Sequence, residues 1–145
     1  MQFIKYTRSD YDSCLSIFNE NCPNFFAAGE RDDYIHFLKE DSKEYLVGKQ
    51  NRETVCAFGM KLDPDIKRGR ISWIMVSPSS KGIGLGTKMF SLVRETARQQ
   101  NLLAIDIAAS HLSASFFKKF GAETLQEISD GWGTGMHRID MQLIL

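Results

Sequence analysis

The chain has 145 residues, of which 43% are hydrophobic, and its formal net charge at pH 7 is +0. A chain of this length buries one substantial core, so we expect a single domain over residues 1–145. The charges are balanced and interspersed, which argues against nucleic acid or a membrane surface as a partner. No apolar stretch approaches the ~20 residues of a membrane span.

The cysteines and the N-terminus indicate a cytoplasmic protein. Cys14, Cys22 and Cys56 are odd in number, and their spacing is not that of a zinc site. Cys14 and Cys56 lie in apolar patterns and are expected in the core. Because the first residues also lack the layout of a secretory signal, we expect reduced thiols, a cytoplasmic location and no metal.

The first half of the chain predicts one short strand, two helices and three further strands. Ser9-x-x-Asp12 resembles a capping box and begins the first helix, which Asn21 to Asn24 end. The second helix is acidic in its first turn, as the helix dipole favours. In chain order, the expected elements are a strand at 1–7, helices from about 9 and at 30–40, and strands at 44–48, 54–61 and 70–76.

The second half predicts two helices and three strands. A helical repeat of apolar residues begins near Thr87, and the apolar run 102–109 is typical of a strand covered on both faces. A short helix at 112–120 follows. Strands at 122–128 and 136–145 flank a glycine loop at 131–135. The chain is therefore of the α/β (α+β) class, with the order β-α-α-β-β-β-α-β-α-β-β.

The glycine-rich segment after strand 70–76 is the most informative motif. Gly82, Gly84 and Gly86 alternate just before a helix begins, so no side chains block the backbone N–H groups there. This arrangement predicts a pyrophosphate site. Gly86-Thr87-Lys88 has the wrong order for a P-loop, and the segment lacks the third glycine of a dinucleotide fingerprint.

The segment resembles the acyl-coenzyme A signature of the GNAT superfamily of N-acyltransferases: Arg or Gln, two residues, Gly, one residue, then Gly or Ala. Lys81 stands at the first position, and Gly84 and Gly86 stand at the glycine positions. The resemblance implies that acetyl-CoA is bound. Backbone groups of Met75 and Val76 would pair with its pantetheine arm. The pyrophosphate would be held by Lys81, Gly82, Ile83, Gly84, Leu85, Gly86 and Thr87.

The same resemblance implies the GNAT fold. This fold has a mixed, mostly antiparallel seven-stranded sheet that splays between its fourth and fifth strands, with about four helices around it. Coenzyme A enters the gap between the splayed strands.

A later segment, 113–122, resembles the family's last helix. In the family, a Tyr near the end of this helix faces the coenzyme A sulfur, and an Asn often precedes it. Phe117 stands at the Tyr position and Ser110 at the Asn position. We expect both to contact coenzyme A. Phe117 has no proton to donate, so the usual general acid is absent.

The sequence leaves the general base open. Some GNAT enzymes place a glutamate on the strand before the glycine loop, but 70–76 contains no carboxylate. His137 is the first candidate, because it follows the loop expected to overhang the acceptor and can titrate near neutrality. An exposed histidine at a strand start is the alternative. His111 is the second candidate, His36 reads as a helix-face residue, and a water-mediated mechanism without a base stays open.

Aromatic residues of the first helical region and the last loop are candidates for binding the acceptor. Tyr34 and Trp132 are our candidates, the latter because a glycine loop is a poor place to bury an indole. Phe25 and Phe26 are expected in the core or in this pocket. Trp73 and Ile74 are expected in the core.

The resemblance therefore predicts an N-acetyltransferase that moves the acetyl group of acetyl-CoA to the amine of a small molecule or peptide. The alternative is a non-catalytic acyl-CoA sensor or partner module on the same fold, favoured by Phe117, Ser110 and the missing strand carboxylate. A purely structural domain would not need the glycine loop. We expect a monomer or a homodimer.

Overall fold

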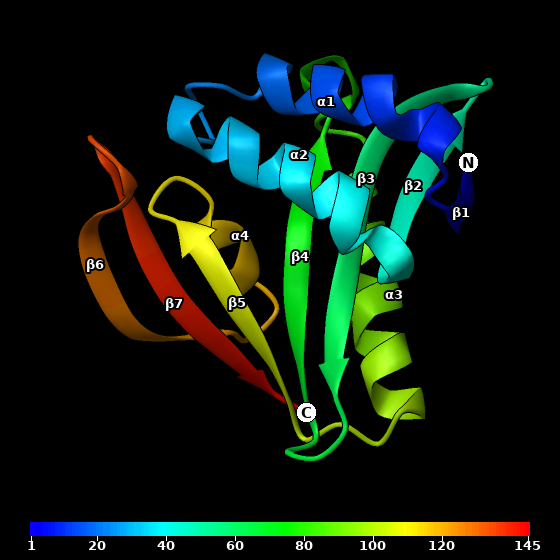
Figure 1. Cartoon of the computed structure of the whole chain (residues 1–145). Helices are drawn as coiled ribbons and strands as arrows, with labels where there is room; N and C mark the ends of the chain where they lie inside the picture. Colours follow the sequence, from blue (N-terminus) through cyan, green and yellow to red (C-terminus); the bar gives the residue numbers. More distant parts are fainter.

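The computed structural model describes residues 1–145, and all its strands join one seven-stranded sheet of order β1-β2-β3-β4-β5-β7-β6 (Figure 1). Only β4 and β5 run parallel; the other neighbours are antiparallel. The strands are β1 (Gln2–Lys5), β2 (Tyr45–Gln50), β3 (Glu53–Asp63), β4 (Arg68–Val76), β5 (Ala104–Ser110), β6 (Glu123–Gly133) and β7 (Met136–Ile144).

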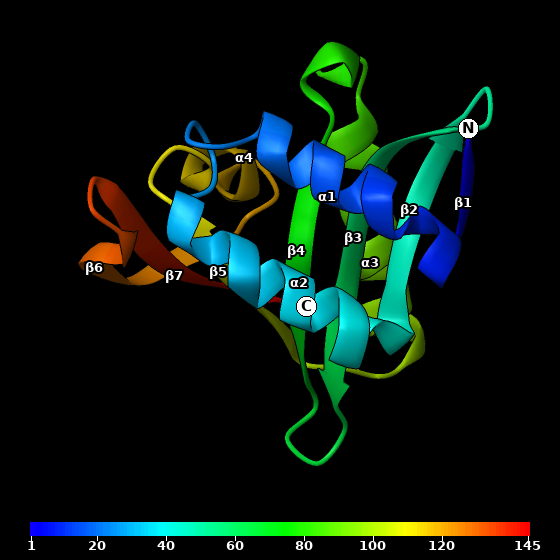
Figure 2. The same ribbon diagram turned by 45° about the horizontal axis from the view of Figure 1, so that its top comes forward.

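The helices cover both faces of the sheet: α1 and α2 lie on one face, and α3 and α4 on the other (Figures 1 and 2). They are α1 (Tyr11–Glu20), α2 (Arg31–Glu40), α3 (Leu85–Gln99) and α4 (Ala114–Lys118). Acidic side chains fix the starts of α1 and α2. Asp10 accepts a hydrogen bond from the Thr7 N–H (2.9 Å), and Glu30 accepts one from the Ala27 N–H (2.8 Å). None of the helices is long and apolar enough to cross a membrane.

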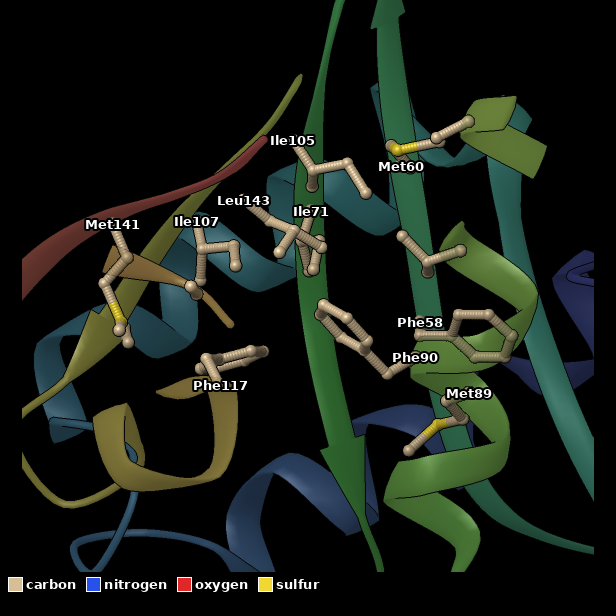
Figure 3. Packing of buried hydrophobic residues seen from close by; sticks show 14 of the residues in the cluster. Phe58, Met60, Ile71, Met89, Phe90, Ile105, Ile107, Phe117, Met141 and Leu143 are labelled. Carbon is tan, nitrogen blue, oxygen red and sulfur yellow. The ribbon is translucent and has the colours of Figure 1, made fainter. Parts of the chain in front are cut away.

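Two hydrophobic clusters hold these layers together. The larger lies between the sheet and helices α3 and α4, where Phe90 and Phe117 pack near Ile71 of β4 and Ile107 of β5 (Figure 3). The smaller lies beneath α1 and α2 and contains Phe18, Tyr34 and Tyr45. Each face of β3 and β4 therefore packs against its own core, which keeps these strands rigid.

The parallel strands β4 and β5 pair over only part of their length. Arg68, Gly69 and Arg70 pair with Ala104, Ile105 and Asp106, and no pairing continues beyond them. The Arg68 guanidinium holds the paired end together, donating to both Asp106 carboxylate oxygens at 2.7 and 3.0 Å. Beyond this point the strands diverge (Figure 1). The splayed, mixed seven-stranded sheet expected from the sequence is confirmed.

Several predicted boundaries differ from the observed ones. Helix α3 begins at Leu85, earlier than predicted, because Gly84 takes a left-handed φ of 82° and serves as its N-cap. Strand β6 continues to Gly133, so the predicted loop 131–135 narrows to a turn. The Asp130 carboxylate accepts the Gly135 N–H there at 2.8 Å, which tightens the hairpin.

Candidate functional site

A cavity of about 1190 Å³ fills the gap between the diverging strands β4 and β5. We call its two ends the loop end and the aromatic end. The loop end is lined by Lys81, Gly82, Gly84, Leu85, Gly86 and Thr87. The aromatic end is lined by Phe26, Glu30, Phe37, Trp73 and Trp132, whereas Phe25 contacts Lys81 at the loop end. Strand β4 runs between the two ends, so ligands bound at both would meet beside it.

The loop end presents a run of free backbone donors. No backbone N–H from Gly82 to Thr87 has a hydrogen-bond partner in the protein, and the first N–H bonded in α3 is that of Lys88. The first turn of α3 also carries no acidic side chain. Free N–H groups and the positive end of a helix dipole together favour an anion. The side chain of Ile83 is exposed and does not line the cavity.

Gly84 and Gly86 are each required to be glycine for a different structural reason. A Cβ at Gly86 would lie 3.0 Å from the Phe116 ring, so Gly86 lets α3 approach α4 closely. Gly84 has open space around its Cβ position but a φ of 82°, which most side chains disfavour. The loop is therefore shaped by backbone conformation and by close packing.

The Lys81 side chain joins the loop to the segment between α1 and α2. Its Nζ lies 3.1 Å from Asn21 Oδ1 and 3.6 Å from the centroid of the Phe25 ring. Burial lowers the pKa of this lysine. The buried Asn21 amide in turn donates to the Val76 carbonyl at 3.0 Å, at the end of β4. An anion at this end therefore meets mainly backbone N–H groups.

A β-bulge interrupts β4 in the middle of the cavity wall. Met75 pairs with Ala57 and Ser72 pairs with Gly59, so Trp73 and Ile74 together face one residue of β3. Trp73 has a φ of 42°, which is unusual for a residue other than glycine. A bulge re-aims the backbone locally. The side chain of Trp73, expected in the core, packs partly buried against the smaller cluster and also lines the cavity.

Two buried tyrosines support this bulge from below. The Tyr45 hydroxyl donates to the Trp73 carbonyl at 2.6 Å, and the Tyr34 hydroxyl lies 3.0 Å from that of Tyr45. Because the Tyr45 proton is engaged, Tyr34 is the donor of this second bond. Burial raises the pKa of both hydroxyls well above the usual value, which keeps them protonated. Tyr34, predicted to bind the acceptor, is fully buried and does not line the cavity.

The side of the cavity formed by β5 and α4 contains no ionisable acid. Phe117 is 3% exposed, lines the cavity and packs against the Phe90 ring, with 6.0 Å between ring centroids. The Ser110 and Ser113 hydroxyls lie 3.1 Å apart and also line the cavity. Phe117 and Ser110 therefore both line the cavity, and their predicted contact with coenzyme A stays a prediction.

None of the three histidines lines the cavity. His137 and His111 pack on each other, with 4.7 Å between ring centroids. Their Nδ1 atoms accept backbone N–H groups, from Asp130 for His137 (3.0 Å) and from His137 for His111 (3.1 Å). These bonds fix the hairpin. The structure therefore does not bring the predicted base, His137, to the site.

The aromatic end combines residues that are far apart in the sequence. Trp132 of β6 donates its Nε1 proton to the Ala109 carbonyl of β5 at 3.0 Å, and the Arg138 guanidinium lies 5.3 Å from its ring centroid. The Phe26 and Trp73 ring centroids lie 5.9 Å apart. Of the two predicted acceptor residues, Trp132 therefore reaches the cavity and Tyr34 does not.

Glu30 is a cavity residue that sequence reasoning missed. It is only 6% exposed, and burial, together with the nearby charge of Asp33, raises the pKa of its carboxyl to about 7. In the sequence, an acidic residue at a helix start indicates no more than a cap. Its position after Phe25 and Phe26 is the one local signal of a different role. No group of three or more His, Cys, Asp or Glu side chains is placed to hold a metal ion.

Comparison with known proteins supports one family. The model of the acetyltransferase (GNAT) family matches residues 11–122. The fold is similar to that of Ard1 from Thermoplasma volcanium, with a TM-score of 0.82 and 15% identity over 99% of this chain and 97% of that one. It is also similar to ribosomal-protein-alanine N-acetyltransferase from Brucella melitensis (TM-score 0.75, 18% identity, 100% of both chains).

A third similar structure contains a ligand. It is an aminoglycoside 6'-N-acetyltransferase complexed with coenzyme A, with a TM-score of 0.77 and 11% identity over 99% of this chain and 97% of that one. No curated protein sequence matches the chain.

Proposed function

We propose that this chain, which belongs to the acetyltransferase (GNAT) family, moves the acetyl group of acetyl-CoA to the amine of a small molecule or peptide. The observation that carries the proposal is the unpaired stretch of β4 and β5, along which one cavity leads from the free N–H groups of residues 82–87 to the aromatic end. One cavity thus offers a place for each substrate.

The loop end fits the donor. The pyrophosphate of acetyl-CoA carries the negative charge that the free N–H groups from Gly82 to Thr87 and the start of α3 favour. The edge of β4 near Met75 and Val76, which β5 leaves unpaired, would offer backbone groups to the amides of the pantetheine arm, although the Val76 carbonyl already accepts the Asn21 amide. Ser110 and Phe117 line the opposite side. This assignment uses every cofactor residue that the sequence predicts except the exposed Ile83 side chain.

The bulge fits the chemistry of the transfer. The acceptor nitrogen attacks the thioester carbonyl carbon, so the carbonyl oxygen gains negative charge and needs fixed donors. Backbone N–H groups re-aimed at Trp73 and Ile74 are the nearest candidates, and the Tyr34–Tyr45–Trp73 hydrogen bonds hold them in place. Holding the two reactants at such a site can supply several orders of magnitude in rate. Phe117 supplies no proton, so the departing thiolate takes one from the acceptor nitrogen or from water.

A non-catalytic acyl-CoA sensor is the second candidate, and Phe117 favours it because the usual acid is missing. The aromatic end favours the enzyme, because a sensor of the donor alone needs no further aromatic lining around a buried carboxylate. A cytoplasmic location and a monomeric or homodimeric state stay predictions.

Amine-dependent release of the coenzyme A thiol separates the two candidates. The purified chain is mixed with acetyl-CoA and a panel of primary amines, and free thiol is followed with time. Release that depends on both the protein and the amine supports the enzyme. Binding of acetyl-CoA with no release on any amine supports the sensor. Absence of acetyl-CoA binding would overturn both.

A further inference from the structure

We propose that Glu30 is the general base of this site and that the aromatic end binds a primary amine carried on an apolar or aromatic body. This inference rests on the proposed acetyl transfer. It assigns the base that the sequence left open and names the chemical class of the acceptor.

The first support is the unpartnered oxygen of Glu30. Its Oε2 accepts the Ala27 N–H at 2.8 Å, whereas its Oε1 has no partner in the protein, and no cation forms an ion pair with the carboxylate. Thr54 Oγ1 is the one buried side-chain polar atom that is sealed from solvent without a partner. Oε1 is therefore reached from the cavity that Glu30 lines. A buried carboxylate without a cation is costly, and a bound ammonium would supply that cation.

The second support is the apolar surface around this oxygen. Phe26, Phe37, Trp73 and Trp132 line the same end of the cavity. The β6–β7 hairpin packs against the segment before Glu30, because a Cβ at Gly133 would lie 3.0 Å from the Ala27 Cβ. Aromatic rings and a low dielectric strengthen the attraction between an ammonium and a carboxylate. One charge among aromatic rings selects one ammonium on an apolar body.

The charged residues that line the rest of the cavity do not favour a polyamine. Glu40, Asp41 and Glu44, at the opposite end of α2 from Glu30, line the cavity together with the cations Lys43, Lys61 and Arg70. All six side chains belong to exposed residues. A second ammonium would therefore find no net negative field there, and exposed ion pairs contribute little.

In the proposed reaction, Glu30 accepts one proton from the acceptor amine. The acceptor enters as an ammonium, R–NH₃⁺, and gives one proton to Glu30 Oε1. The neutral nitrogen then attacks the thioester carbonyl, so that a C–N bond forms and the C–S bond breaks. The second nitrogen proton ends on the coenzyme A thiolate, directly or through water. The products are R–NH–CO–CH₃ and coenzyme A thiol, and Glu30 returns its proton to solvent.

The charges around Glu30 suit a base that works near neutrality. Burial, against the opposing Ala27 N–H and with a smaller contribution from Asp33 on α2, raises the pKa of Glu30 to about 7. Burial and the nearby charge of Glu30 raise the pKa of the Cys22 thiol. The facing residues of β4 and β6, Trp73, Trp132 and Gly133, carry no charge. A pKa near the working pH is what a general base requires.

The test compares the full chain with Glu30→Gln, using 2-phenylethylamine as the probe. The glutamine oxygen can still accept the Ala27 N–H, so the cap of α2 remains. We expect kcat/KM for the probe to fall about 100-fold at pH 7 and to lose its rise between pH 6 and pH 8. Calorimetric binding of the probe to the protein saturated with coenzyme A should weaken about tenfold. The control, Asp33→Asn, should keep the rate and move the rise to lower pH.

The base assignment and the acceptor class are each tested by a separate result. If Glu30→Gln folds, binds the probe and turns it over like the wild type, Glu30 is only a helix cap and the inference is wrong. If spermidine or a peptide with an N-terminal alanine is acetylated more efficiently than 2-phenylethylamine, the acceptor class is wrong. Acetyl-CoA binding measured on the same sample separates these results from a failure of the proposed function, which would show no binding of the donor.

Discussion

The two ends of the cavity present different kinds of binding groups. The loop end presents backbone N–H groups from one continuous segment, Gly82 to Thr87, placed at the start of a long helix. The aromatic end presents side chains brought together from Phe26, Glu30, Trp73 and Trp132. A backbone site keeps its ligand when most side chains change, whereas a side-chain site changes its ligand with one substitution. Under the proposed function, we therefore expect substitutions at the aromatic end to change the acceptor without changing the donor.

The two ends also differ in how they affect the stability of the protein without a ligand. The loop end exposes N–H groups to water, which satisfies them at little cost. The aromatic end buries the Glu30 carboxylate without a cation, which raises its pKa to about 7 and destabilises the ionised protein. Substitutions at the two ends should therefore have different signatures in binding, stability and rate.

The largest expected effect comes from placing a negative charge at the loop end. Gly84→Asp should weaken acetyl-CoA binding at least ~100-fold, because the carboxylate repels the pyrophosphate where the dipole favours it. Gly84→Asn is the matched control, since asparagine tolerates the φ of 82° about as well and carries no charge. Calorimetry with acetyl-CoA measures both. Equal binding by the two variants would mean that the pyrophosphate lies elsewhere.

The next effect concerns stability and tests the aromatic end. The pKa of Glu30 is 4.5 when exposed and about 7 in the folded protein, so the folded state binds this proton more tightly. The stabilisation that results is fully present below pH 4.5 and is lost as the pH rises through about 7. Glu30→Gln avoids this loss. At pH 8 it should exceed the wild type in free energy of unfolding by on the order of 2 kcal/mol.

Urea unfolding at pH 4.5 and pH 8 measures this difference, which should shrink toward zero at the lower pH. Asp33→Asn removes a charge of the same sign from an exposed position and should change stability by less than about 0.5 kcal/mol. A wild type that is more stable than Glu30→Gln at pH 8 would contradict the buried, unpaired state of the carboxylate.

A smaller effect is expected at the bulge that joins the two ends. Tyr45→Phe removes the donor to the Trp73 carbonyl and should lower kcat about tenfold, with little change in the acetyl-CoA dissociation constant. Tyr34→Phe leaves that bond intact and should lower kcat less. Steady-state kinetics of thiol release distinguish them. A larger loss for Tyr34→Phe would show that the hydroxyls do not act through the bulge.

The smallest effect is expected at Trp132. Trp132→Phe keeps an aromatic ring but loses the hydrogen bond to the Ala109 carbonyl. KM for the amine should rise about threefold, while acetyl-CoA binding stays unchanged. A change in acetyl-CoA binding, with KM for the amine unchanged, would mean that Trp132 contacts the donor and not the acceptor.

The loop end was predictable from the sequence and the aromatic end largely was not, for a physical reason. Free N–H groups need glycines at fixed spacing before a helix, and that pattern is contiguous in 82–87. The direction of a side chain depends on the packed fold. Tyr34 lies on the face of α2 that meets the core, so it supports the bulge from below instead of binding a ligand.

Because side-chain direction depends on the packed fold, the sequence also failed to predict that Glu30 lines the cavity and that His137 does not. Glu30 reads as a helix cap, and it is one, but the β6–β7 hairpin that buries it lies about 100 residues further along the chain. In the sequence, His137 is a candidate base because imidazole is a common general base, yet its ring packs on His111, which follows β5, and does not line the cavity. The sheet order and its splay were predictable because resemblance to the family extends over most of the chain.

A crystal structure of the protein with coenzyme A and 2-phenylethylamine tests the central claim most directly. We predict the pyrophosphate on the backbone N–H groups of residues 82–87, the pantetheine arm between β4 and β5, and the amine nitrogen within hydrogen-bonding distance of Glu30 Oε1. A pyrophosphate bound away from residues 82–87, or an amine bound away from the aromatic end, would contradict the division of the cavity into a donor end and an acceptor end.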